Sequence, residues 1–371
     1  MDTLAHHLEH PAIPLEKHTR ARQIELACKL PPKAIYLDTK FWLIGRDVVR
    51  HVRTGPEDVK LVECLEELVA ARRIFCPISE PVFLEVMKQE DRSTRRATAE
   101  LIDRWSHGVS LIHPRRRMAT ELAHFFFEAD RPDRVFAIRE LVWTRLSFVM
   151  GELFPSETPF DPATELAIQK AFFDHMWDLP LTEMVDHLAE ATTADLDVDR
   201  QKLVDSINEG VAAWAHTIDG FPAAFAEEAR GTADLMQDVG LEILRDMAMR
   251  KQVTPLPGDS PQDVVEVRAM IAGLLQQPVA QMKLRTAYIT AAIHAAIRAN
   301  RGRRFKTNDL LDFEHAAAAL GYCDAFFTDA ALGKLLTREP LQFDQRCDCP
   351  VAWTSEEALR VLTQQPPSSA A

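Results

Sequence analysis

Short apolar runs alternate with helical periodicity over the first third of the chain. Three runs rich in β-branched and aromatic or aliphatic residues, 34–37, 74–78 and 109–112, predict buried strands. Between them, as in 59–69, apolar residues recur at the three- and four-residue spacing of a helix. This order of strands and helices is typical of βαβ units, so the pattern favours an α/β fold with a parallel sheet.

The strand signal stops at about residue 115 and returns only after residue 300. The stretch between has long helical patterns separated by breakers such as Gly220-Phe221-Pro222. Strand character returns at 325–328 and again at 351–353. Two α/β segments therefore flank a helical block, and we expect the two segments to form one sheet.

These patterns divide the chain into five parts. The first is a polar leader, which we expect to be an appendage with a helix over 19–30 that ends before Pro31-Pro32. The last is rich in Pro, Ser and Ala and is typical of a flexible tail. The expected bounds are 1–32 for the leader, 33–115 for the first α/β part, 116–299 for the helical insertion, 300–360 for the second α/β part and 361–371 for the tail.

Acidic residues recur where the predicted strands end. Asp38 follows the first strand, Glu85 lies on the helix after the second, Asp312 opens the helix before the fourth, and Asp329 follows the fourth. Ligands of open parallel sheets bind beyond the carboxyl ends of the strands, so we expect these acids to converge. Grouped carboxylates need a compensating charge, and Mg²⁺ or Mn²⁺ prefers such oxygen ligands. Metal ions held in this way hydrolyse phosphodiester bonds without a side-chain nucleophile.

The same residues carry a resemblance to a known family. In Ala34 to Thr39, in Ile78-Ser79 with Glu85 six positions after the serine, and in 312–329, the chain resembles the PIN-domain nucleases. The resemblance implies a three-layer α/β/α fold with a parallel sheet, here interrupted by an all-α insertion. It also implies that Asp38, Glu85 and Asp312 hold Mg²⁺ or Mn²⁺, and that the chain is a metal-dependent endoribonuclease acting on RNA. It covers about 33–115 and 300–355.

The fourth acid departs from the family pattern. Members usually carry it two positions after the threonine, where this chain has Ala330. Asp329, one position early, and Asp324, ahead of the strand, are the two candidates. Asp309 lies one turn before Asp312 and is either an outer acid of the site or a solvated first-turn carboxylate.

Each of these residues taken alone also has a simpler interpretation. An Asp at a strand end is often the N-cap of the next helix, and capping is the safer interpretation of Thr39 and Ser79. His315, three positions after Asp312, is more typical of a packed or surface residue than of a base. A degenerate PIN-like scaffold that binds RNA or protein, and a nuclease directed at DNA or at particular structures, therefore remain alternatives.

Net charge decides where a nucleic acid could bind. The formal charge of −13 argues against binding by bulk attraction, so a local basic patch is needed. Residues 283–306 hold seven Lys or Arg and no acid, just before Asp309. We predict RNA contacts from the end of this run, against the alternative of a solvated helix end. The predicted residues are Arg301, Arg303, Arg304 and Lys306; Arg92, Arg95 and Arg96, and Arg115 to Arg117, are further candidates.

Composition and the remaining motifs exclude other classes. The 371 residues are 47% hydrophobic and 27% charged, as in globular proteins, and six cysteines are too few for a disulfide scaffold. No apolar run is long enough for a membrane span and no signal peptide is visible, so we expect a cytoplasmic protein. His6, His7 and His10 have metal-ligand spacing, but nothing else in the leader supports a metal.

Overall fold

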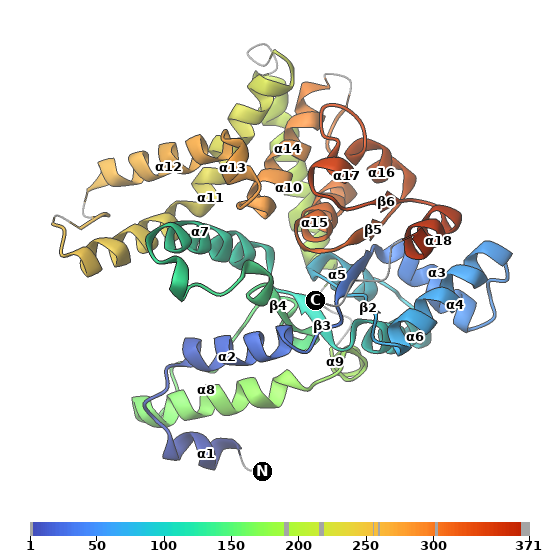
Figure 1. The fold of residues 1–371 in the computed structure, drawn as a ribbon, viewed down its shortest axis with the longest axis horizontal. Coiled ribbons are helices and arrows are strands. Elements are labelled where there is room, and N and C mark those ends of the chain that lie inside the picture. The colour runs from blue at the N-terminus through green and yellow to red at the C-terminus, as the bar shows by residue number, and fades with distance from the viewer. Residues whose placement is uncertain are drawn as a thin grey trace.

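Four parallel strands form the central sheet, in the order β2-β1-β5-β6 (Figure 1). This computed structural model describes residues 3–188, 193–214, 219–254, 256–258, 260–300 and 303–364. The strands are β1 (Lys33–Leu37), β2 (Ile74–Phe75), β5 (Ala325–Phe327) and β6 (Val351–Ala352). β1 pairs with β5 from Ile35–Ala325 to Leu37–Phe327, so the two α/β segments form one sheet, as predicted.

The third predicted strand forms, but outside this sheet. β3 (Val109–Leu111) pairs antiparallel with β4 (Trp143–Arg145), and a single parallel bridge from Ser110 to Ile78 connects it to the segment after β2. β2 is also shorter than predicted, because Pro77 has no N–H to donate to a strand ladder. β4 lies in the block that we expected to be entirely helical; a strand of three residues is too short to show a period.

Helices cover both faces of the central sheet. α15 contacts β1 and β5, while α3 contacts β1 and α4 contacts β2. α3 lies against α6 where Gly45 faces Trp105, so that the two helices approach closely. The helices of the two α/β segments are α3 (Thr39–Val49), α4 (Pro56–Ala70), α5 (Glu80–Met87), α6 (Arg92–Ser106), α15 (Thr307–Tyr322), α16 (Ala330–Leu336), α17 (Phe343–Arg346) and α18 (Ser355–Gln364).

The middle of the chain is mainly helical, as predicted. α11 packs along α12 and α14, and α14 packs on α15, so this block shares a continuous core with the sheet. Its helices are α7 (Pro114–Asp130), α8 (Pro162–Trp177), α9 (Leu181–His187), α10 (Thr193–Trp214), α11 (Gly220–Lys251), α12 (Pro261–Leu275), α13 (Pro278–Gln281) and α14 (Arg285–Ala299), with 3₁₀ turns at Pro132–Arg134, Ile138–Glu140 and Leu146–Phe148.

The leader is part of the folded body and not an appendage. It forms α1 (Thr3–Glu9) and α2 (Leu15–Ala27), which both pack on α8 (Figure 1). α2 begins four residues earlier than we predicted, directly after Pro14. At the other end, α18 continues to Gln364, and the rest of the predicted tail lies outside the described residues.

Two expectations from composition can be compared with the fold. The six cysteines are all free thiols, as predicted. Within the described ranges, no helix is both long enough and apolar enough to cross a membrane.

Candidate active site

Asp38 and Asp329 lie together at the carboxyl ends of β1 and β5. Asp38 is the N-cap of α3 and accepts a hydrogen bond from the Phe41 N–H at 3.3 Å. Asp329 is the N-cap of α16 and accepts from the N–H groups of Ala331 at 2.5 Å and Leu332 at 3.0 Å. All of these bonds use Oδ1, so both carboxylates cap a helix and keep Oδ2 for another partner.

Glu85 is held beside them by two donors. Its Oε2 accepts from the Thr39 hydroxyl and lies 3.1 Å from Nε2 of His315 on α15. The other nitrogen of this buried histidine, Nδ1, lies 2.8 Å from the Tyr36 hydroxyl, which in turn contacts Ser79 Oγ. Thr39 and Ser79 do not cap helices with their side chains, contrary to our interpretation, because these hydroxyls join the network around Glu85.

This network sets the charge of Glu85 and His315. Burial would raise the pKa of Glu85, but the hydrogen bonds from His315 and Thr39 outweigh it, so the pKa is lowered. Burial would lower the pKa of His315, but Glu85, with smaller effects from Asp38 and Asp312, outweighs it and raises the pKa. His315 thus orients an ionised carboxylate, a role that its position three residues after Asp312 suggested only weakly.

Asp312 has no such support. It is half-buried on α15, and within the described residues its carboxylate makes no hydrogen bond or ion pair. Burial and then the charges of Asp329, Glu85 and Asp309 raise its pKa to about 7, against the effect of His315. Burial likewise raises the pKa of Asp38 to about 6.

The acids lie near one another but do not form a compact chelating group. In the described part of the chain, no three of these carboxylates have ligand oxygens all within 4.8 Å of one another. Mg²⁺ usually binds only one or two carboxylates directly and keeps several waters, so this spacing fits a hydrated hard cation. The buried Thr328 hydroxyl lies close enough to Asp38 to lower its pKa, against the effect of burial.

Two of the other predicted acids do not join this group. Asp324 precedes β5 and accepts from the Ala34 N–H at 2.8 Å, at the start of β1. The three residues of β5 separate it from Thr328, and these four residue steps place it about 13 Å away at the opposite edge of the sheet. Asp309 is buried beside Asp312, but its oxygens accept from the Lys306 N–H at 2.9 Å and pair with Arg303 at 3.3 Å. It stabilises the start of α15 instead.

The predicted basic run is partly neutralised, by three ion pairs among its described residues. Arg304 and Lys306 are exposed, and neither side chain forms an ion pair with a described residue, whereas Arg301 lies outside the described residues. The other four have partners within the protein. Lys283 pairs with Glu128, Arg285 donates to the carbonyl oxygens of Met282 and Gly321, Arg298 pairs with Glu228, and Arg303 pairs with Asp309.

The two alternative basic patches are also mostly occupied. In the first, Arg92 and Arg96 bind the carbonyl and the carboxylate of Asp186, and Arg95 is buried. In the second, Arg116 pairs with Glu152 and Arg117 is fully buried, which leaves Arg115 exposed. Runs of basic residues in sequence therefore do not correspond to free basic surface in this fold.

Comparison with known proteins identified no relative: no family model, curated protein or solved structure matches the chain.

Proposed function

We propose that the chain is a metal-dependent nuclease of PIN-like α/β/α architecture, which hydrolyses RNA at a Mg²⁺ or Mn²⁺ site formed by Asp38, Glu85, Asp312 and Asp329. The observation that carries this proposal is Asp312. An ionised, half-buried carboxylate that has no donor among the described residues and lies close to three other acids is unfavourable unless a cation compensates its charge. The parallel sheet with helices on both faces supports the architecture.

The side chains divide the work. The cation would be held by Asp312 and by the Oδ2 atoms of Asp38 and Asp329. The hydrogen bonds from His315 and Thr39 would keep Glu85 ionised and oriented toward it. When bound, the metal supplies a hydroxide nucleophile and stabilises the leaving oxygen. The buried Thr328 hydroxyl lies close to Asp38 and could orient a water molecule there.

The substrate assignment rests on the approach to α15. Arg304 and Lys306 are the exposed cations nearest in sequence to Asp309 and Asp312. A phosphate backbone held by them would be led toward the start of this helix. Three other cations of the run, Lys283, Arg298 and Arg303, are paired within the protein, which favours a short contact with one strand over a long basic groove.

Cleavage assays with purified protein test the proposal. With Mn²⁺, the protein should cut single-stranded or structured RNA and leave 5′-phosphates, and Asp38→Asn or Asp312→Asn should abolish cutting. Asp324→Asn is the matched control, because it makes the same change at the opposite edge of the sheet and should retain activity. Cutting by Asp312→Asn at the wild-type rate would contradict the site.

Two further outcomes separate the alternatives. A parallel DNA panel that is cut faster than RNA would move the substrate to DNA. Calorimetry that detects no binding of Mg²⁺ or Mn²⁺, together with RNA or protein binding, would favour an inactive scaffold.

A further inference from the structure

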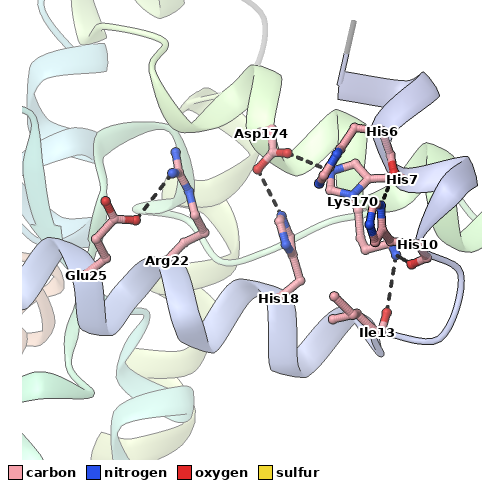
Figure 2. Close-up of polar contacts among 9 residues, drawn as sticks. All are labelled: His6, His7, His10, Ile13, His18, Arg22, Glu25, Lys170 and Asp174. Atoms are coloured by element: carbon pink, nitrogen blue, oxygen red, sulfur yellow. Dashed lines mark hydrogen bonds and ion pairs between the residues drawn. The ribbon is translucent and has the colours of Figure 1, made fainter. Parts of the chain in front are cut away.

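A cluster of side chains of the types that ligate metals lies apart from the acids, where the leader meets the helical block (Figure 1). His7 on α1 and His18 on α2 both point toward Asp174 on α8 (Figure 2). His7 Nε2 lies 2.7 Å from one carboxylate oxygen, and His18 Nε2 lies 2.9 Å from the other. Three elements separated by up to 167 residues of sequence therefore place their donor atoms together.

The donor atoms have the chemistry and spacing of a transition-metal site. All three lie within 4.8 Å of one another, the only such group of His, Cys, Asp or Glu in the described part of the chain. Two imidazole nitrogens and one carboxylate oxygen suit Zn²⁺, whose bonds to such atoms measure about 2.0–2.2 Å. In tetrahedral geometry these atoms would be about 3.4 Å apart, so with Oδ2 of Asp174 as the ligand, His7 Nε2, now 2.7 Å from it, needs to move away by roughly 0.7 Å.

Space remains for a fourth ligand. A cavity of about 310 Å³ borders the three side chains, with His6, His10 and Asp178 also in its lining. The buried Lys170 ammonium lies near the cluster but donates to the carbonyl oxygens of His10 at 3.0 Å and Ile13 at 3.3 Å. It holds the turn between α1 and α2, and its charge moderates the affinity for a cation.

We propose that His7, His18 and Asp174 bind one Zn²⁺ ion whose fourth position opens to this cavity. The metal would join α1 and α2 to α8. The site also differs in chemistry from the proposed nuclease site, because its nitrogen donors favour a different class of metal from the all-carboxylate group.

Zinc titration of the untagged, full-length protein tests this inference. After removal of metals with EDTA, calorimetry with ZnCl₂ in excess Mg²⁺ should give one Zn²⁺ per chain. Replacement of Zn²⁺ by Co²⁺ should give the visible absorption of a tetrahedral ion. His7→Gln and His18→Gln keep an N–H that can donate to Asp174 but lose the imidazole ligand. Each should therefore weaken Zn²⁺ binding by more than the roughly 10- to 100-fold that is typical when only a hydrogen-bond partner of a ligand is lost.

Matched variants make the result specific. His175→Gln changes an exposed histidine next to Asp174 on the same helix and should bind Zn²⁺ like the wild type. Asp312→Asn should also bind it normally, so failure here and failure of the nuclease site are distinguishable. The double variant His6→Gln/His10→Gln tests for adventitious chelation by the leader helix, and loss of binding in it alone would overturn the assignment.

Limited proteolysis gives a second readout. Zn²⁺ should slow cleavage between α1 and α2 in the wild type and have no effect in His18→Gln. Absence of one-to-one binding, or equal binding by the wild type and both Gln variants, would mean that the three side chains form a hydrogen-bonded group only.

Discussion

Replacing Asp312 with Asn should stabilise the protein in metal-free buffer while it abolishes cleavage. Asn has nearly the same shape but never ionises, so the variant avoids the cost of a charge in this half-buried position. The pKa of Asp312 is about 7, against an ordinary value of 3.8. That difference of about 3 pH units corresponds to about 4 kcal/mol at roughly 1.36 kcal/mol each. Solvent screening reduces it, and we expect a gain of about 2 kcal/mol at pH 8.

The size of this gain in stability depends on pH. The folded protein keeps Asp312 neutral up to about pH 7, whereas the unfolded chain ionises it above about pH 4. The contribution of Asp312 to the stability of the wild type is therefore greatest below pH 3.8 and is lost as the pH rises to about 7. The advantage of Asp312→Asn should therefore shrink to under about 1 kcal/mol at pH 5.

Urea unfolding of the wild type and of Asp312→Asn in EDTA, at pH 5 and at pH 8, measures the gain in stability at each pH. Asp324→Asn is the control and should not stabilise the protein, because Asp324 accepts a backbone hydrogen bond and lies 3.7 Å from Arg139. Mn²⁺ should raise the stability of the wild type more than that of Asp312→Asn. The reasoning fails if Asp312→Asn is less stable than the wild type at pH 8, or if the difference does not depend on pH.

Three other results are expected. At low Mn²⁺, the logarithm of the cleavage rate should rise with pH at a slope approaching two below about pH 6 and level off above about 7, because Asp38 and Asp312 must ionise to bind the cation; a flat profile from pH 5 to 8 would contradict this. Arg304→Ala/Lys306→Ala should flatten the dependence of log K for single-stranded RNA on log salt by about 1.4, whereas Arg298→Ala, which removes a paired arginine, should leave it unchanged. Gly45→Ala should lower the free energy of unfolding by about 1–3 kcal/mol, because the new methyl group would lie 2.7 Å from Trp105, whereas Gly231→Ala meets nothing within 4 Å and should not destabilise.

Local patterns predicted the central sheet and the acids at its carboxyl edge. β1 and β5 are continuous apolar runs, and the acid that follows each is placed by the strand itself, so Asp38 and Asp329 followed from sequence position. The same rule could have excluded Asp324, since a residue ahead of a parallel strand lies at the opposite edge. Glu85 and Asp312 were singled out by their place on helices next to predicted strands, and the resemblance added the role of metal ligands.

Contacts between distant segments could not be read in this way. The pairing of β3 with β4 depends on a strand that folds back from later in the chain. The ion pairs that neutralise part of the basic run likewise depend on distant acids. The group of His7, His18 and Asp174 shows the same limit: the leader alone offered two of its ligands, and the third lies on α8. Charge and ligand patterns predict which residues are able to act, whereas packing determines which are free to do so.

The pairing of β1 with β5 also determines when the protein can become active during its synthesis. The two strands lie 290 residues apart, which the ribosome takes roughly 15 to 60 seconds to translate at about 5–20 residues per second. For most of that interval the nascent chain carries Asp38 and Glu85 without Asp312 or Asp329, and one edge of β1 has no partner strand. A nascent chain that ends before Asp312 would thus lack half of the proposed metal ligands, and the proposed site could not form until β5 and Asp329 have been translated.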